Sequence, residues 1–250
     1  MPMKSIDKAL EASAQTTRNA LQRNSIRFAV AVLAWFGGGA YGHLVGNLRS
    51  AGYTPEEVDL VLVTHLHSDH IGGLTTQDGK RVLPNAEIYA AKAESDFWLS
   101  PEIAAKAPKD AQQFFQSAQA IAAPYITAGK WHTFSGSGPI VDGMQVVPLP
   151  GHTPGHTGYK FSSQGKTILF WGDIIHAQRV QLQHPEVTVL FDIDPTAAAV
   201  TRNQLLPKLA HEDVVIAGPH MLLPGLGRLH KEGGGYSWAP VAFTDQWAEK

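Results

Sequence analysis

The chain has 250 residues, and its 20 Lys and Arg against 22 Asp and Glu give a net charge of −2. This balance excludes a broad electrostatic attraction to nucleic acid or to an anionic membrane surface, so we expect neither as a partner. Cysteine is absent, which excludes disulfide bonds, thiolate metal ligands and a cysteine nucleophile. Any bound metal must therefore be held by histidine and carboxylate side chains.

Residues 1–40 are an atypical N-terminal segment, for which we expect a helix or disorder. Within it, residues 28–36 (FAVAVLAWF) are continuously apolar. Nine residues are far fewer than the ~20 that span a bilayer, so we expect a buried strand or helix there. The alternative is the apolar part of a signal peptide, because the small residues 37–40 follow it. A cytoplasmic and a periplasmic location are both compatible with these features.

The segment 41–63 predicts a helix followed by a strand. Residues 41–51 have a helical apolar face, and Gly52 follows at the position where a helix commonly ends. A short helical turn is expected at 55–57. The run 58–63 is almost entirely β-branched or aliphatic, as is typical of a strand buried on both faces.

Strands and helices are predicted to alternate through the rest of the chain, which indicates an α/β fold. No repeat or shift in composition marks a boundary, so we expect residues 41–250 to form one domain. An apolar run also covers 187–191. The expected strands are 86–91, 131–134, 145–149, 157–162, 167–171 and 214–217, and the expected helices are 92–99, 109–122 and 195–210.

The stretch VTHLHSDHIGG (63–73) concentrates metal-binding side chains directly after the predicted strand 58–63. In extended backbone, His65 and His67 lie on one face, so a single cation can bind both. Asp69 and His70 come next, where two glycines allow the chain to turn toward a second cation. Imidazole nitrogen and carboxylate oxygen both suit Zn²⁺. A solvated, histidine-rich loop is the alternative interpretation.

Three later stretches repeat the pattern of an apolar run, a glycine and then His or Asp. They are PLPGHTPGHTG, with His152 and His156; ILFWGDIIH, with Asp173 and His176; and VVIAGPH, with His220. Each follows a predicted strand, and the carboxyl ends of strands in open α/β sheets are where ligands gather. This pattern predicts a site assembled from several loops at one sheet edge.

The four-part pattern HLHSDH, GHTPGHTG, GD and GPH resembles that of the metallo-β-lactamase-fold hydrolases. With AGYTPEEVD, SDFWLS and GLGRLHKEGGGY, the sequence is most similar to the methyl parathion hydrolase-like branch, over roughly residues 41–241. The resemblance implies a four-layer αββα sandwich. Only 64 residues precede His65, and VLAWFGGGAYG lies where relatives have an Asp-Thr-Gly turn, so we expect the N-terminal strands to be incomplete or altered.

The resemblance also implies two divalent metal ions, with Zn²⁺ expected and Mn, Fe or Co as alternatives. It assigns His65, His67 and His152 to the first ion and Asp69, His70 and His220 to the second, with Asp173 bridging both. In such pairs the cations lie about 3.5–4 Å apart and acidify a shared water, which gives a metal-bridging hydroxide near neutral pH. Asp69 is placed to orient that hydroxide or accept its proton, so Asp69 and Asp173 are the candidate catalytic residues.

Further residues are candidates for the surroundings of the metals. Trp98 and the pair Phe114-Phe115 resemble the aromatic pocket of this branch, although helix core is an equal alternative. His176 is expected either to line the substrate cavity or to be a polar rim residue. His156 is expected to stabilise the turn or the metal ligands rather than to bind metal itself.

The leading functional hypothesis is hydrolysis of a small-molecule ester, either an organophosphate triester or an aryl or carboxylic ester. Acyl-homoserine lactonases resemble the same motifs but usually carry a Tyr three residues after the bridging Asp, where this chain has His176. Glyoxalase II enzymes share the first motif, but no basic glutathione-binding C-terminal module is recognisable. A third hypothesis is a truncated, catalytically inactive member that only binds metal. An incomplete sheet would expose an edge and favour a homodimer.

Overall fold

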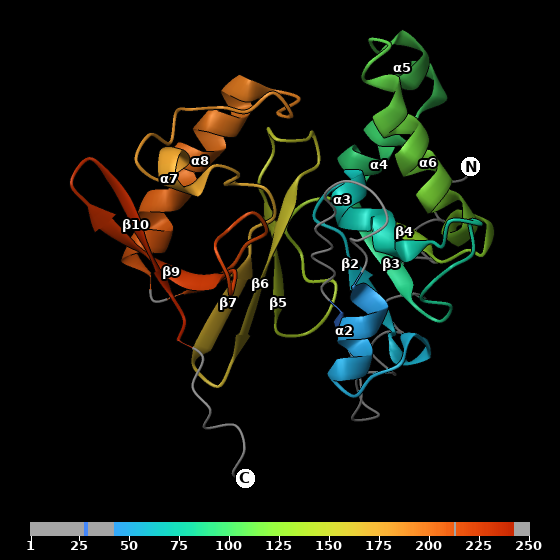
Figure 1. The fold of residues 1–250 in the computed structure, drawn as a ribbon, viewed down its shortest axis with the longest axis horizontal. Coiled ribbons are helices and arrows are strands. Elements are labelled where there is room, and N and C mark those ends of the chain that lie inside the picture. The colour runs from blue at the N-terminus through green and yellow to red at the C-terminus, as the bar shows by residue number, and fades with distance from the viewer. Residues whose placement is uncertain (1–27, 30–42, 213, 243–250) are drawn as a thin grey trace. The chain divides into compact units, whose positions relative to one another are not determined.

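The computed structural model describes residues 28–29, 43–212 and 214–242 (Figure 1). The chain divides into two compact units, residues 1–146 (unit 1) and residues 147–250 (unit 2). Apart from Phe28 and Ala29, the segment 1–40 lies outside the described residues, so the expectation of a helix or disorder there stays a prediction. Among the helices that are described, none has the length and apolar character needed to cross a membrane.

Unit 1 contains a four-stranded parallel sheet in the order β1-β2-β3-β4. Strand β1 pairs with β2 through Phe28 opposite Leu60 and Ala29 opposite Val61. The apolar run 28–36 therefore begins with a strand. The strands are β1 (Phe28–Ala29), β2 (Leu60–Leu62), β3 (Glu87–Ala91) and β4 (Trp131–Phe134). The helices are α2 (Leu44–Ser50), η1 (Pro55–Glu57), α3 (Ser68–Ile71), η2 (Gly72–Leu74), α4 (Lys92–Trp98), α5 (Pro101–Lys106) and α6 (Gln112–Thr127).

The core of unit 1 explains why β2 has an unbroken apolar sequence. All three residues of β2 are buried, whereas β3 alternates between buried and half-buried positions. Helices α4 and α6 add Trp98, Phe115 and Tyr125 to the same core. The hydroxyl of Tyr125 donates a hydrogen bond to Leu74 O at 2.9 Å, which ties the chain after η2 to α6.

Helix α2 ends as its sequence predicts. Gly52 adopts a φ of +83°, the left-handed region in which glycine is favoured. Its N–H donates to Arg49 O at 3.0 Å, and the N–H of Tyr53 donates to Leu48 O at 2.9 Å. These two bonds are the Schellman arrangement that satisfies the last carbonyls of a helix and turns the chain toward β2.

Unit 2 is built on a six-stranded sheet in the order β10-β9-β8-β7-β6-β5, with β5 starting just before the unit boundary. The pairs β6–β7, β8–β9 and β9–β10 are antiparallel. Strands β7 and β8 are parallel, which requires a crossover connection, and the chain makes it through two helices. The strands are β5 (Met144–Pro148), β6 (Thr157–Ser163), β7 (Lys166–Phe170), β8 (Val215–Ala217), β9 (Leu226–Glu232) and β10 (Gly235–Pro240), and the helices are α7 (Gln178–Gln181) and α8 (Pro195–His211).

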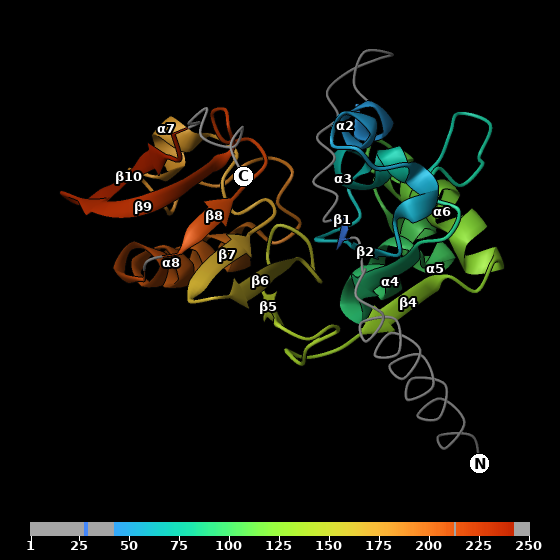
Figure 2. The same cartoon turned by 90° about the horizontal axis from the view of Figure 1, so that it is seen from below.

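Helix α8 lies along one face of this sheet (Figure 2) and packs against β9. The core between them includes Leu169, Leu206 and Ile216. The first turn of α8 approaches the loop before β6 so closely that a Cβ on Gly151 would lie 2.2 Å from Ala198 N. Only glycine fits at that position, where φ is +133°.

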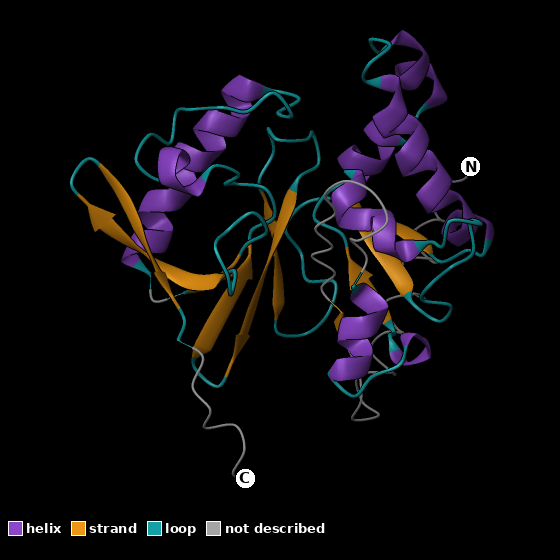
Figure 3. Ribbon diagram, in the orientation of Figure 1, coloured by secondary structure: helices purple, strands orange, loops and turns teal. Residues whose placement is uncertain are grey.

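The α/β class predicted from the sequence is confirmed in both units (Figure 3). Helix α5 and the hairpin of β9 and β10 were not predicted, and α6 continues past the predicted end at 122 to Thr127. The apolar run 187–191 forms no helix or strand. Its side chains Leu190 and Phe191 are exposed rather than buried, so apolar sequence there does not indicate a core element.

Candidate metal centre

The loop after β2 and the helix α3 that follows it bring three imidazoles together in unit 1. The ring centroids of His65 and His67 are 4.8 Å apart, and those of His65 and His70 are 4.0 Å apart. His65 and His70 are buried, whereas His67 and Asp69 are half-buried. The carboxylate of Asp69 lies 3.3 Å from His70 Nε2. The structure thus groups all four side chains that the motif HLHSDH singled out.

Two neighbours fix the backbone and side chains of this loop. Leu66, between the first two histidines, donates its N–H to Oε1 of Glu94 at 2.9 Å. Glu94 comes from α4 and is fully buried. Thr64 Oγ1 lies 3.1 Å from His65 Nδ1, a contact that orients the ring. Sequence reasoning missed Glu94, because a single Glu on a short helix gives no sign of burial.

The aromatic residues predicted for a substrate pocket lie beside His67. Trp98 is 2% exposed and belongs to the core of unit 1, and its ring meets that of His67 edge-on at 5.2 Å. Phe114 is half-buried, with its ring 6.3 Å from that of His67, while Phe115 is a core residue. Trp98 and Phe115 are therefore core side chains, and a pocket role for Trp98 or Phe114 stays a prediction.

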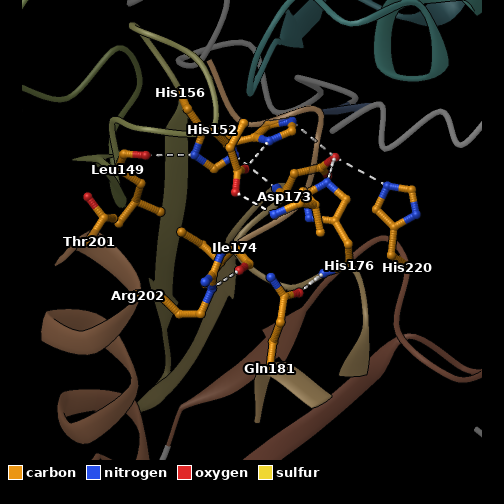
Figure 4. Close-up of polar contacts among 12 residues, drawn as sticks. Leu149, His152, His156, Asp173, Ile174, His176, Gln181, Thr201, Arg202 and His220 are labelled. Carbon is orange, nitrogen blue, oxygen red and sulfur yellow. Dashed lines mark hydrogen bonds and ion pairs between the residues drawn. The ribbon is translucent and has the colours of Figure 1, made fainter. Parts of the chain in front are cut away.

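Unit 2 places three imidazoles around a single carboxylate oxygen (Figure 4). Oδ2 of Asp173 lies 3.0 Å from His176 Nε2, 3.2 Å from His220 Nε2 and 3.5 Å from His152 Nε2. Asp173 is only 2% exposed. His152 follows β5, Asp173 and His176 follow β7, and His220 follows β8. The strand ends thus gather these side chains as the sequence predicts.

His156 holds Asp173 in place. Its Nδ1–H donates to Leu149 O at 2.9 Å, so its Nε2 carries the lone pair that accepts the Asp173 N–H at 2.8 Å. Figure 4 shows His156 between Leu149 and the loop of Asp173. Because both ring nitrogens are used in this way, His156 is not available as a ligand. Its role in these bonds matches the prediction that it stabilises the turn.

Asp192 orients His152 from the opposite side. Its Oδ1 lies 2.9 Å from His152 Nδ1, and its Oδ2 accepts the N–H of Val189 at 3.0 Å. Burial alone would raise the pKa of Asp192, but these hydrogen bonds lower it below its usual range. Burial lowers the pKa of His152, although Asp192 and Asp173 oppose that shift. A neutral imidazole with its Nδ1–H on a carboxylate presents Nε2 as a metal ligand.

Two buried polar side chains brace the surrounding loops. Gln181 accepts the N–H groups of His176 and Ala177 at 2.7 and 3.0 Å. Arg202, from α8, donates to Ile174 O at 2.7 Å and to Val187 O at 2.7 Å. Burial lowers the pKa of Arg202, and the nearby charge of Asp192 opposes that shift. Sequence reasoning missed Asp192, Gln181 and Arg202, because they lie outside the histidine motifs.

His220 adopts a backbone conformation that is rare outside glycine. Its φ is +60°, which costs energy in a residue with a Cβ, and such strained residues are enriched at functional sites. Two residues earlier, a Cβ on Gly218 would lie 2.2 Å from Nε1 of the buried Trp171. Only glycine therefore fits between this loop and the indole, two residues before His220.

The side chains present fit a divalent cation. In His152 the Nδ1–H on Asp192 leaves a lone pair on Nε2, and this lone pair faces an oxygen of Asp173 that is also an acceptor. Two acceptors in a buried place repel each other unless a cation lies between them. Imidazole and carboxylate without thiolate form the donor set of catalytic zinc sites. The His and Asp clusters thus support divalent metal binding, with zinc as the expected ion.

The match to a family model now identifies the class of protein. Residues 28–220 match the model of the metallo-beta-lactamase superfamily. The chain belongs to that superfamily, whose fold agrees with the α/β units described above. This confirms the fold and the superfamily predicted from the four-part histidine pattern, but not the methyl parathion hydrolase-like branch.

Individual relatives are hydrolases of several kinds. A hydroxyacylglutathione hydrolase of Aeromonas hydrophila is 30% identical over 48% of this chain and 34% of its own length. The hydrolase GloC of Haemophilus influenzae is 29% identical over 66% of this chain and 71% of its own length. The chain thus spans only about a third of the first of these curated relatives.

Solved structures add two similar folds at higher coverage. AbOPH, described as a hydrolase in the beta lactamase superfamily, is 38% identical with a TM-score of 0.78, over 83% of this chain and 72% of that one. AidC, a dizinc quorum-quenching lactonase, is 28% identical with a TM-score of 0.77, over 86% of this chain and 75% of that one. The chain is similar to both.

Proposed function

We propose that this protein is a two-metal hydrolase of ester bonds in small molecules. The ligand assignment follows the four-part motif. His65, His67 and His152 hold the first ion, Asp69, His70 and His220 hold the second, and Asp173 bridges them. Superfamily membership supports this assignment, as does the similarity to AidC, which is a dizinc enzyme.

The observation that carries the proposal is the convergence on Asp173. A buried carboxylate with imidazole nitrogens 3.0–3.5 Å from one of its oxygens is expensive to desolvate. The arrangement is fixed by the hydrogen bonds that His156 Nε2 accepts from the Asp173 N–H and that Asp192 accepts from His152. Such pre-organisation is what a metal-ligand set requires and what a structural ion pair does not need.

Each residue has a definite task in this scheme. Two bound cations would supply an acidified water and stabilise the charge that develops on the ester oxygens. His156 keeps the Asp173 backbone fixed, and Asp192 keeps His152 in one tautomer. Glu94 holds the loop that presents His65 and His67. Asp69, at 22% side-chain exposure, can still reach water, so it is the group to orient the attacking water or to take its proton.

The leading substrates are organophosphate triesters and aryl or carboxylic esters. The position three residues after Asp173 carries His176, whose Nε2 is directed at Asp173 rather than away from it. This position therefore lacks the phenolic hydroxyl that acyl-homoserine lactonases with the same motifs usually have. This feature favours acyclic esters over lactones.

A second candidate is hydrolysis of acyl-homoserine lactones, which the similarity to AidC favours. A kinetic panel separates the two. We expect kcat/KM for a phosphotriester or an aryl ester to exceed that for an acyl-homoserine lactone. The reverse ranking would replace the leading substrate class with the lactone, and no turnover of any ester by metal-loaded protein would support the inactive, metal-binding hypothesis.

Metal analysis tests the site separately from the substrate. We expect two divalent ions per chain in protein purified without chelator, and loss of activity in His67→Ala. Fewer than one ion per chain in folded protein contradicts the two-metal proposal. Because the metal count needs no substrate, it remains decisive if the native ester is absent from the panel.

A further inference from the structure

We propose that His176 is a metal ligand and that His152, Asp173 and His176 form a metal site contained in unit 2. The ligand set above leaves His176 out. Ligand atoms of these three residues lie within 4.8 Å of one another. The inference rests on the proposed metal chemistry, but not on the identity of the ester.

The distances at Asp173 agree with shared coordination. Ligands bound at about 2.0–2.1 Å in a tetrahedral site lie about 3.3 Å from one another. His176 Nε2 and His152 Nε2 are 3.0 and 3.5 Å from Oδ2 of Asp173. His176 is thus as well placed as His152, which the motif already assigns. Imidazoles and a carboxylate are also a combination of ligands that catalytic zinc sites use.

The backbone of His176 is fixed by a buried side chain. Gln181 is fully buried, and its Oε1 accepts the N–H groups of His176 and Ala177. Its amide nitrogen donates to Val187 O at 3.0 Å, which ties both loops to α7. If His176 were only a polar residue at the solvent-exposed rim, its backbone would not need these hydrogen bonds. A metal ligand, in contrast, needs its orientation fixed.

The ring of His176 is also packed between the two assigned histidines. It stacks on His220 with ring centroids 5.0 Å apart and planes 22° apart, and its centroid lies 4.7 Å from that of His152. Its side chain is only 15% exposed. The ring therefore cannot swing toward solvent without disturbing both neighbours, which is consistent with a permanent ligand.

A self-contained site predicts that unit 2 keeps an ion without the histidines of unit 1. The test uses the full chain stripped with chelator, then titrated with Zn²⁺ or Co²⁺ against a chromophoric competitor. Co²⁺ additionally reports its ligands through its visible absorption. His176→Gln keeps a donor that can reach Asp173 but removes the imidazole, so it separates ligation from a mere hydrogen bond. His184→Gln, at an exposed histidine of the same unit, is the matched control.

We expect His176→Gln to weaken the binding of one ion at least about tenfold and to change the Co²⁺ spectrum, while His184→Gln changes neither. In the His67→Gln/His70→Gln background we expect one ion to remain, and adding His176→Gln should remove it. Circular dichroism of the metal-free proteins checks folding. If His176→Gln does not fold, His176→Asn takes its place.

Two outcomes overturn the inference. One is wild-type affinity and spectrum in His176→Gln, and the other is no bound ion in the His67→Gln/His70→Gln background. If the wild-type chain still binds two ions in either case, the proposed two-metal function stands and only the role of His176 falls. A folded wild-type chain that binds no ion overturns both proposals.

Discussion

The two clusters of candidate metal ligands, one in each unit, are built in opposite ways. Unit 1 presents its donors within six consecutive residues, in the loop after β2 and the short helix α3. Unit 2 collects its donors from three loops, and two of them, Asp173 and His152, are braced by His156 and Asp192, which are distant in sequence. A local motif needs few supports because the chain itself sets the spacing, whereas a dispersed site depends on the fold around it.

The largest effect is expected from substitution of Asp173, around which the donors of unit 2 gather. Asp173→Asn removes the charge around which three imidazoles gather, so we expect fewer than one ion per chain and activity at background. Metal analysis and ester hydrolysis measure this. The matched control is Asp142→Asn at an exposed position, for which wild-type values are expected. Retention of two ions in Asp173→Asn would show that the carboxylate is not central.

The second-largest effect is expected from substitution of His156, which holds the backbone of Asp173 in place. His156→Leu leaves the buried Asp173 N–H and Leu149 O without their partner, at about 1–3 kcal/mol of unfolding free energy for each group. Urea denaturation of the metal-free chain measures the loss. His184→Leu, at an exposed histidine, should leave the free energy nearly unchanged. A loss of less than about 1 kcal/mol of unfolding free energy in His156→Leu would mean that unit 2 tolerates the removal of these hydrogen bonds.

A smaller effect is expected in unit 1, where Glu94 braces the histidine loop through one hydrogen bond to Leu66. Glu94→Ala removes the acceptor of the Leu66 N–H, and we expect a loss of about 1–3 kcal/mol. Glu94→Gln keeps an acceptor oxygen, so we expect it to retain much of the stability that Glu94→Ala loses. Comparing the two variants by denaturation tests the hydrogen bond itself. Equal losses in both would assign the effect to the charge of Glu94 instead.

The smallest effect concerns the β3–β4 edge of unit 1, away from the histidine loop. Burial tends to raise the pKa of Glu87, but hydrogen bonds with Lys130 and His132 at 2.8 and 2.6 Å lower it overall. A carboxyl with a lowered folded pKa stabilises the protein above its unfolded pKa of about 4.3 and loses that contribution as pH falls through the folded value.

We therefore expect Glu87→Gln to cost less than about 1 kcal/mol near pH 7, because the pair is partly exposed. The difference in Tm between Glu87→Gln and the wild type should shrink as the pH falls below about 4.3. A difference that stays constant with pH would attribute the effect to packing. Lys160–Glu212, an exposed pair in unit 2, offers Glu212→Gln as a control with little expected effect.

The sequence by itself determined the local half of the site and the class of fold. His65, His67, Asp69 and His70 were identifiable because they are adjacent, and a buried strand was identifiable because β2 has an unbroken apolar run. The later donors His152, Asp173 and His220 were found through glycine turns after predicted strands. In each case the signal lies within a few residues, where backbone geometry alone relates sequence to structure.

Only the tertiary structure decided what supports those donors. Asp192, Gln181 and Arg202 act through hydrogen bonds to residues 5 to 40 positions away, and no local pattern marks them. The apolar run 187–191 shows the same limit, since Leu190 and Phe191 are exposed despite their composition. Burial and pairing depend on which distant segments pack together, and His176 became a candidate ligand only once its ring was seen to pack between His152 and His220 beside Asp173.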